Sequence, residues 1–395
     1  MERYQGADLV GVNAAAGPGP SDHASAGEAP PDSVADRRVV VAMSGGVDSS
    51  IAAALLLEQG YRVSGVRMRL WSEEGVNGGT GDPEWSLRAA DDARRVCDAL
   101  GIPLRVVDYR APFREQVVEY FVAEYSQGRT PNPCLACNRY IKFGLLLDEA
   151  VAHEADFLAT GHYARVRRSN GSYQLLRGLD RSKDQSYFLY MLGQRHLRRL
   201  LLPLGDYSKQ QVRAMARERG LSTGGAAESQ DLCFVPEGDY RRVLGRLIPE
   251  SVLPGPIVDS GGKVLGQHRG LPFYTVGQRK GLGVSAPEAL YVVALNVPNN
   301  ALVVGPSSEL GRTALLAKEV VFVSGCFPAA PLLVEAKIRY RARLRRATLE
   351  PLSEQRARVS FEQPLRDITP GQAVVFYDGD VVLGGGIICD QPADR

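Results

Sequence analysis

The segment SGGVDSS, residues 44–50, constrains the fold of this chain more than any other feature of its sequence. An apolar run at 39–43 precedes it, and an apolar helical pattern follows over 49–59. A strand that ends in a glycine-containing loop and passes into a helix directs backbone N–H groups and the helix dipole towards one point. The glycines let a phosphate approach the backbone closely, and Ser44 and Ser49 add hydroxyl donors. The sequence therefore predicts an anion-binding loop, which is not a Walker A loop because no Gly-Lys-Ser/Thr follows.

The rest of the first half alternates between strand and helix patterns. Further strands are expected at 61–70, 104–107 and 156–160. Helices are expected at 85–100, 112–125 and 140–153. Strands separated by helices of this length indicate an α/β fold with a doubly wound parallel sheet. The ligand site of such a sheet is expected beyond the carboxyl ends of its strands.

The pattern changes from about residue 206. An amphipathic helix is expected at 208–219, with Ser208 as its N-cap, and turns rich in glycine and proline follow. From about residue 291 onward, short strands with regular turns predict a small barrel or sandwich. We therefore expect a disordered tail, a catalytic domain, a small central α+β domain and a C-terminal β domain, over residues 1–37, 38–205, 206–285 and 286–395 respectively.

Composition narrows the class of protein. Of the 395 residues, 44% are apolar and 23% are charged, as in an ordinary globular protein, and the net charge of +2 points to no particular partner. One stretch, RYRARLRR at 339–346, is strongly basic. No run approaches the ~18–20 apolar residues of a membrane span, and six cysteines are too few for a secreted disulfide scaffold. We expect a cytoplasmic protein that does not cross a membrane.

Three cysteines stand in polar, loop-like sequence. Cys134 and Cys137 lie in TPNPCLACN, and Cys233 lies in SQDLCF. A CxxC pair alone is ambiguous between zinc binding, redox chemistry and catalysis, and the second pair of ligands that zinc normally has is missing. We expect these three thiols to serve chemistry, whereas Cys97 and Cys326 are predicted to be inert residues of apolar elements.

In their order along the chain, these motifs resemble the tRNA-specific 2-thiouridylases, the MnmA-type family within the PP-loop ATP pyrophosphatases. The resemblance covers roughly residues 38–390 and rests on MSGGVDSS, TPNPxxxCN, ATGHY, LLRGLDxxKDQSYFLY, SQDLCF, YTVGQRKGLG, RYR and PGQAVVFY. It implies an adenylating domain with the adenine nucleotide alpha hydrolase-like fold, a central tRNA-binding domain and a C-terminal β-barrel.

The resemblance further implies a tRNA-uridine 2-sulfurtransferase. Such an enzyme uses ATP, with Mg²⁺, to adenylate the C2 oxygen of the wobble uridine in tRNA, and then replaces that oxygen by sulfur. The products are 2-thiouridine, AMP and pyrophosphate. A sulfur-relay protein or a cysteine desulfurase is the implied persulfide donor.

Individual residues also acquire implied roles from the family. The residues implied in the loop that holds the ATP phosphates are Ala42, Met43, Ser44, Gly45, Gly46, Val47, Asp48 and Ser49. Met68 and Gly161 match positions that contact the adenosine. Asn132, Pro133 and Cys134 match the segment that touches the target base. Further tRNA-binding positions are matched by His162, Lys183, Asp184, Gln185, Arg339, Tyr340 and Gln372.

For sulfur transfer, the family pattern makes Cys233 the persulfide carrier and Cys137 the partner nucleophile. Cys137 attacks or resolves the persulfide and leaves a transient Cys137–Cys233 disulfide. Both thiols must become thiolates, which favours an electropositive and partly exposed site. Cys134 stands where some members of the family have Asp, a candidate general acid or base. Three thiolates allow an alternative in which Cys134, Cys137 and Cys233 hold a 4Fe–4S cluster.

Two other classes of function are weighed against thiolation. A small-molecule synthetase with the same loop would lack the cysteine pair and the RNA-suited barrel. A non-catalytic RNA-binding or redox-sensing protein would not need an intact SGGVDSS loop. All of these features are present together in this chain, which favours the thiolating enzyme.

Overall fold

The computed structural model describes residues 34–71, 84–221, 233–235, 239–352 and 355–389. Most of the predicted tail, 1–33, lies outside these ranges. The last residues of the predicted tail that the structure describes, Val34–Asp36, form a short 3₁₀ turn. The side chain of Arg62 holds the turn, because it donates to the Ala35 carbonyl (3.0 Å) and to the Asp36 carboxylate (3.3 Å).

A five-stranded parallel sheet forms the centre of the first half, as predicted. Its strands are β1 (Arg38–Ala42), β2 (Arg62–Arg69), β3 (Leu104–Asp108), β4 (Phe157–Ala159) and β7 (Leu200–Leu201), in the order β3-β2-β1-β4-β7. From β1, the chain therefore adds β2 and β3 on one side of the sheet. It then returns to the other side of β1 to add β4 and β7. The loops after β1 and β4 meet at this switch point, which is where doubly wound sheets bind ligands.

Helices cover both faces of this sheet. Side chains of α1 (Val47–Glu58), α2 (Glu84–Leu100) and α8 (Lys209–Glu218) share one hydrophobic cluster with β1. Side chains of α6 (Leu146–Ala152) join a second cluster, which includes Leu158 of β4. We assigned α8 to the central domain, but Val212 and Ala216 pack against α1, so this packing favours a later end for the first domain.

Two long helical stretches connect β3 to β4. The first consists of α3 (Arg110–Phe113), a π-helical turn (Arg114–Val118) and α4 (Glu119–Ser126). The second consists of α5 (Pro133–Ala136), a π-helical segment (Cys137–Leu145) and α6. It begins earlier than the expected residue 140, because Asn132 caps it and proline is favoured in the first turn. Cys134 and Cys137 thus lie in a helix rather than in the predicted loop.

The C-terminal domain is a closed antiparallel barrel. Its six strands are β12 (Arg312–Phe322), β13 (Leu332–Lys337), β14 (Arg345–Pro351), β15 (Ala357–Leu365), β16 (Ala373–Asp378) and β17 (Val381–Ile388). The sheet closes because β12 pairs with both β15 and β17. A hairpin from the first half, β5 (Ala164–Ser169) and β6 (Ser172–Arg177), extends the same sheet through β6 and β17.

A smaller mixed sheet forms the central domain. It contains β8 (Gly255–Asp259), β9 (Val264–His268), β10 (Tyr291–Asn296) and β11 (Ala301–Gly305), and α9 (Tyr240–Leu247) precedes it. We expected the chain from residue 286 onward to belong to the barrel domain. Here β11 instead pairs with β8, and Val292 and Leu302 pack against Ile257, so β10 and β11 complete the central sheet.

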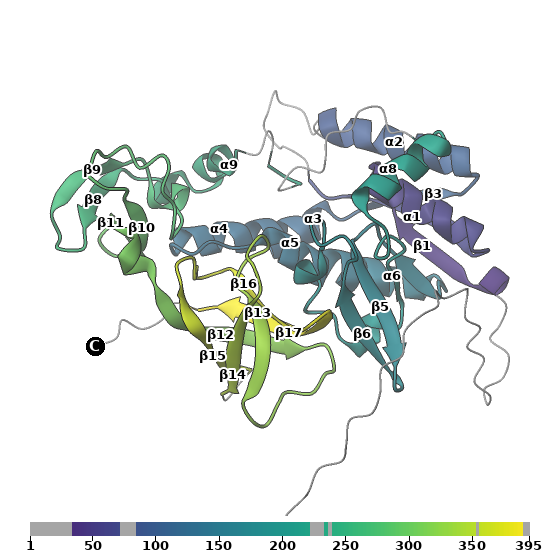
Figure 1. Ribbon diagram of the computed structural model, residues 1–395. Coiled ribbons are helices and arrows are strands. Elements are labelled where there is room, and N and C mark those ends of the chain that lie inside the picture. Colours follow the sequence, from purple (N-terminus) through teal and green to yellow (C-terminus); the bar gives the residue numbers. More distant parts are fainter. Residues whose placement is uncertain (1–33, 72–83, 222–232, 236–238, 353–354, 390–395) are drawn as a thin grey trace, which may run out of the picture.

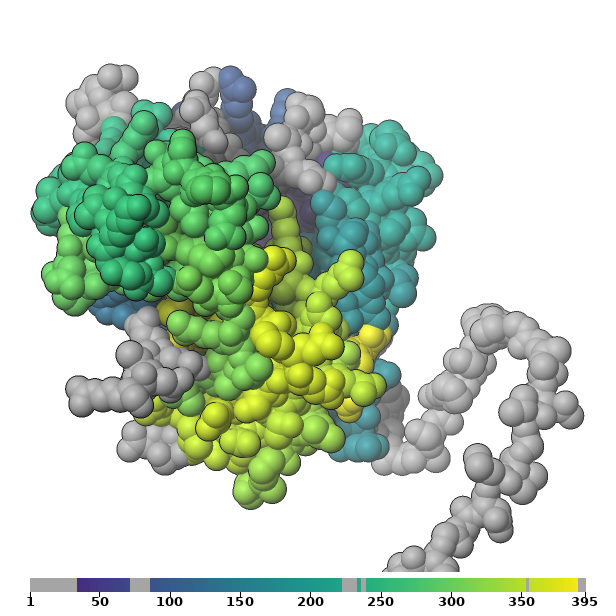
Figure 2. Space-filling model, turned by 60° about the vertical axis from the view of Figure 1, so that its left-hand side comes forward, coloured from purple at the N-terminus to yellow at the C-terminus, as the bar shows by residue number. Residues whose placement is uncertain are grey.

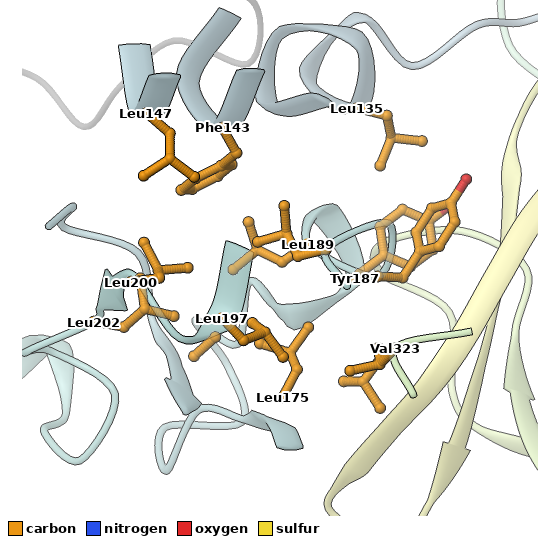
Figure 3. Close-up of a cluster of buried hydrophobic side chains, with 14 of the residues drawn as sticks. Leu135, Phe143, Leu147, Leu175, Tyr187, Leu189, Leu197, Leu200, Leu202 and Val323 are labelled. Carbon is orange, nitrogen blue, oxygen red and sulfur yellow. The ribbon is translucent and has the colours of Figure 1, made fainter. Parts of the chain in front are cut away.

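The barrel and the first domain share one hydrophobic core (Figure 3). Leu135 and Phe143, from the helical stretch that carries the cysteines, lie in the same buried cluster as Val323 of the barrel. The Tyr187 hydroxyl donates to the carbonyl of Ala373 in β16 (2.9 Å). Figure 1 shows the barrel directly beneath α4 and α5, with the central domain at the far end of α4. This core fixes the barrel against the cysteine-bearing helices.

Candidate active site

Hydrogen bonds among its own residues hold the predicted phosphate loop in shape. Gly46 is the N-cap of α1, and the Ser49 hydroxyl donates to its carbonyl (3.0 Å). The Ser44 N–H donates to the hydroxyl of Ser49 (3.2 Å). Gly45 has a φ of +83°, and a Cβ there would lie 2.2 Å from the Ala89 carbonyl oxygen of α2. Glycine is therefore required at position 45 for two independent reasons, its backbone conformation and the close approach of α2.

The loop after β4 lies against the phosphate loop. A Cβ on Gly161 would lie 2.9 Å from the carbonyl carbon of Asp48 and 3.0 Å from the N atom of Ser49. Met68 lies near the carboxyl end of β2, the neighbour of β1. The structure thus places the three segments expected to bind ATP along one edge of the sheet.

Asp48 of this loop is held by two side chains. Lys209, the first residue of α8, donates from Nζ to both carboxylate oxygens of Asp48, at 2.7 and 2.8 Å. The Tyr163 hydroxyl donates to the same carboxylate (2.8 Å). The sequence analysis noted only that Ser208 starts this helix, and it missed Lys209, because nothing in the sequence pairs residues 48 and 209. The result is a lysine ammonium held at the phosphate loop.

An aromatic anchor, Phe234, joins the Cys233 segment to the hydrophobic cluster that contains Cys137. Phe234 is fully buried, and its ring centroid lies 5.8 Å from that of Phe113 and 5.3 Å from that of Phe121. Cys137 is buried in the same hydrophobic cluster. Because Cys233 directly precedes Phe234, the anchor holds this exposed cysteine near the helix that carries Cys137. Both cysteines are free thiols in this structure.

The electrostatic environment differs from the expected one. Burial raises the pKa of Cys137, and the Lys142 ammonium opposes that shift. Desolvation by the surrounding protein, followed by the charges of Cys137 and Cys134, raises the pKa of Cys233, while Lys142 lowers it. The three thiols therefore lie within electrostatic range of one another. Cys233 is exposed at the surface, whereas Cys137 is only 6% exposed.

Lys142 is the second functional candidate that the sequence analysis missed. It follows Cys137 on the π-helical segment, and its charge acts on Cys137, Cys233 and His162. Within the described ranges, no group of three or more His, Cys, Asp or Glu side chains is arranged to hold a metal ion.

Several residues expected to bind tRNA are engaged within the protein. His162 is buried and hydrogen-bonded to the Thr160 hydroxyl (2.7 Å), and burial followed by Lys142 holds its pKa well below the ordinary range, so the ring is neutral. The Asn132 side chain accepts from the N–H of Cys134 (3.2 Å). Gln185 accepts from the N–H of Tyr163 (3.0 Å).

Asp184 is also buried, and its carboxylate is fully engaged. It accepts from the N–H groups of Gly178 (3.0 Å) and Ser186 (3.1 Å) and pairs with Arg177 (3.2 Å). This pattern gives Asp184 the role of shaping the 178–186 loop. Lys183, its partly buried neighbour, lies in the same loop.

The expected barrel residues face the same region. The Tyr340 ring lies 4.5 Å from that of Phe188, and Arg339 donates to the Asp367 carboxylate (2.5 Å). The Gln372 amide donates to the Thr130 carbonyl (2.8 Å). Figure 2 shows the surface hollowed where the green central domain, the teal first domain and the yellow-green barrel meet.

The two cysteines predicted to be inert differ from each other. Cys97 is fully buried in the cluster beneath α1 and α2, as expected. Cys326 is exposed in the turn after β12, where its N–H donates to the Ser324 hydroxyl (3.2 Å), so its predicted burial is wrong. Within the described ranges, no helix is both long and apolar enough to cross a bilayer.

Replacing Lys142 should slow reactions of the Cys137 thiolate. Lys142→Met removes the positive charge that opposes the raised pKa of Cys137, so less thiolate is present at a fixed pH. We expect slower alkylation of Cys137 by iodoacetamide at pH 8, measured by peptide mass spectrometry. Lys209→Met is the matched control, because Lys209 lies at the phosphate loop. Equal alkylation rates in the two variants would contradict this electrostatic role.

Removing Asp184 should destabilise the protein. Asp184→Ala leaves the Arg177 guanidinium and two N–H groups without their acceptor, and breaking a buried pair costs about 3–5 kcal/mol of unfolding free energy. Urea unfolding measures the loss. The control is Asp206→Ala, since that side chain is 76% exposed and its loss should cost less than about 0.5 kcal/mol. Similar losses in both variants would show that Asp184 does not support the loop.

Comparison with known proteins agrees with this architecture. The family model described as "tRNA methyl transferase HUP domain" matches residues 37–237. Those described as "tRNA methyl transferase PRC-barrel domain" and "Aminomethyltransferase beta-barrel domain" match 241–306 and 312–388. These three ranges coincide with the sheet domain including α8, the central domain including β10 and β11, and the closed barrel.

Curated relatives match almost end to end. The tRNA-specific 2-thiouridylase MnmA of Roseiflexus castenholzii is 51% identical over 368 residues, which cover 89% of this chain and 99% of that protein. The MnmA of Carboxydothermus hydrogenoformans is 51% identical over 362 residues, covering 90% and 99%. The MnmA of Clostridium perfringens is 47% identical over 356 residues, covering 89% and 98%. The resemblance seen in the motifs is therefore confirmed over the whole described fold, and the chain belongs to the MnmA family of tRNA-specific 2-thiouridylases.

Proposed function

We propose that this protein thiolates C2 of the wobble uridine in tRNA, using ATP and a persulfide. The observation that carries the proposal is the combination of an intact phosphate loop at the switch point with a buried Cys137 that shares its hydrophobic cluster with Phe234, the neighbour of Cys233 in the chain. An adenylating loop activates an oxygen, and a thiol pair delivers sulfur. The reaction joins these two activities in one protein.

Adenylation makes the oxygen at C2 able to leave. The uridine O2 attacks the α-phosphorus of ATP, an O–P bond forms, and the bond to pyrophosphate breaks. The N–H groups at the start of α1 and the ammonium of Lys209 bind the negative charge of the β- and γ-phosphates. Mg²⁺ bound with ATP would supply further positive charge, and Asp48 is the carboxylate of this loop that would hold it. Met68 and Gly161 are the proposed adenosine contacts.

Sulfur transfer follows from the different exposure of the two cysteines. Cys233 is exposed and takes sulfane sulfur from the donor, a relay protein or a cysteine desulfurase. The terminal sulfur of that persulfide attacks C2, a C–S bond forms, and AMP leaves with the C2 oxygen. The Cys137 thiolate then attacks the Sγ of Cys233, which breaks the S–S bond, leaves sulfur on the uridine and forms the Cys137–Cys233 disulfide. A thiol reductant supplies the two electrons that restore both thiols.

The tRNA is proposed to dock across the three domains. Arg339 and Tyr340 on the barrel and Lys183 in the 178–186 loop are the proposed tRNA-contacting side chains. Asn132, Pro133 and Cys134 then lie beneath the target base. His162, Asp184 and Gln185 have side chains engaged within the protein, so we propose that they support the tRNA site mainly by holding its loops. Gln372 is also engaged within the protein, where it holds the segment that leads into the cysteine-bearing helix.

The iron–sulfur alternative has less support. It requires Cys134, Cys137 and Cys233 to act as three ligands, and these described residues are not arranged to hold a metal ion. The persulfide route needs only Cys137 and Cys233 to meet. We therefore retain the persulfide route and assign Cys134 to contact with the base.

Replacing Asp48 should stop adenylation. Asp48→Ala frees Lys209 and removes the carboxylate at the phosphate loop while leaving the sheet untouched, so tRNA-dependent pyrophosphate release should fall by about 100-fold or more. Thermal melting serves as the control for folding, and Asp206→Ala, at an exposed site, should retain the normal rate. Normal pyrophosphate release by Asp48→Ala would refute the assignment of this loop.

Replacing Cys134 separates the two sulfur chemistries. In the persulfide route Cys134→Ser keeps partial thiolation activity in iron-free protein, because Cys137 and Cys233 are intact. In the cluster route the same variant loses both thiolation and iron–sulfur absorbance. Nucleoside mass spectrometry of tRNA treated with air-purified and with iron-reconstituted variant measures the difference. Activity that appears only after iron reconstitution, in the wild-type protein, would overturn the persulfide route.

A further inference from the structure

The segment that leads into the cysteine-bearing helix is held by two other domains. This lead-in segment, residues 128–131, directly precedes Asn132. The Thr130 N–H donates to the Pro370 carbonyl of the barrel (2.9 Å), and its hydroxyl donates to the Thr275 hydroxyl of the central domain (3.2 Å). The Gln372 amide Nε2 donates to the carbonyls of Thr130 (2.8 Å) and Pro131 (3.4 Å). Four hydrogen bonds therefore fix two consecutive residues.

The barrel turn that grips the segment is itself rigid. Gly371 has a φ of +89°, and a Cβ there would lie 2.9–3.0 Å from three backbone atoms of Thr130, so the two backbones are in direct contact. The Gly371 N–H donates to the Ile388 carbonyl (3.0 Å), and the Ile388 N–H donates to the Gln372 carbonyl (2.8 Å). The last barrel strand thus anchors the barrel turn, residues 370–372.

The chain between the lead-in segment and the thiols is also conformationally restricted. Pro131 and Pro133 restrict the backbone on either side of Asn132, and Asn132 caps the helix through the N–H of Cys134. Cys137 follows one turn later. A displacement of the lead-in segment must therefore move the start of this helix and its cysteines.

The same part of the barrel adjoins the proposed tRNA surface. Asp367, just before the barrel turn, accepts from Arg339 (2.5 Å). A Cβ on Gly277 of the basic central loop would lie 3.0 Å from a carboxylate oxygen of Asp367. A ligand that seats on Arg339 and this loop therefore acts on the chain segment that ends in Gln372.

We propose that the barrel turn is a clamp for the sulfur-transfer thiols, and that Gln372 is its positioning residue. Gln372 acts through Thr130 and Pro131 to place Cys134 and Cys137, and it couples the seating of tRNA on the barrel to the position of the thiols. This role rests on the proposed function, and it differs from a simple tRNA contact because the amide donors of Gln372 point into the protein.

Gln372→Met tests the clamp, because methionine has a similar shape and no donors. In a single turnover with excess enzyme, we expect unchanged tRNA affinity, normal pyrophosphate release and thiolation slowed by about 10–100-fold, as for a misplaced catalytic group. The ratio of 2-thiouridine to pyrophosphate during the turnover should fall. The matched control is Thr369→Val, since Thr369 lies beside the barrel turn and its hydroxyl donates to the Asp367 carbonyl (3.1 Å) rather than to the lead-in segment.

A second measurement needs neither ATP nor tRNA. Loosening the clamp should expose Cys137 and speed its alkylation by iodoacetamide several-fold, while Cys97, buried in another cluster, should react as slowly as in the wild-type protein. Faster alkylation of both cysteines would show general unfolding and refute a local role. Parallel loss of tRNA affinity, pyrophosphate release and thiolation, with unchanged alkylation, would make Gln372 a tRNA contact. If the wild-type protein forms no 2-thiouridine, the proposed function fails, and the alkylation rates still decide whether the clamp exists.

Discussion

The hydrophobic core shared by the first domain and the barrel is the interaction on which the rest of the structure depends. Leu135 contributes to it from a position between the two cysteines of the CxxC pair, and Val323 contributes from the barrel. Burial of this kind supplies most of the favourable free energy of association between domains. Because the helix that carries Cys137 forms part of that core, the sulfur site cannot move independently of the barrel. The phosphate loop is then placed by the parallel sheet on which the same helices pack.

Two lysines act on the charge of the two candidate centres. Lys209 brings its ammonium to Asp48 at the phosphate loop, and Lys142 lies near the thiols and His162. Burial, followed by the charge of Lys142, holds the pKa of His162 well below its ordinary range. Each centre thus has a cation positioned before any ligand arrives, which reduces the reorganisation that a developing negative charge would otherwise require.

The sequence predicted local features well and pairings between distant residues poorly. The loop after β1, the parallel sheet and the packing of Cys97 followed from short patterns of apolar residues and glycines. The same patterns could not show that β10 and β11 pair in the central sheet, since their strand character is the same in either sheet. Lys209 and Lys142 were missed for a related reason, because nothing in the sequence around a lysine shows which distant side chain it will lie near. Cys137 shares its buried cluster with Phe234, nearly a hundred positions along the chain, and no local pattern marks that contact.

The pairing of β6 with β17 has a consequence for how this protein is made. Leu176 of β6 lies opposite Val381 of β17. The free edge of the β5–β6 hairpin is therefore covered only after the last strand of the chain has been made. During synthesis the first domain emerges with that edge unpaired, and exposed strand edges readily recruit other chains. Long-range pairing of this kind also slows folding, since the long chain between β6 and β17 must fold back before the two strands can pair. The barrel therefore completes the first domain late, and a ribosome that stalls shortly before β17 would release a chain whose nearly finished catalytic half is prone to aggregate.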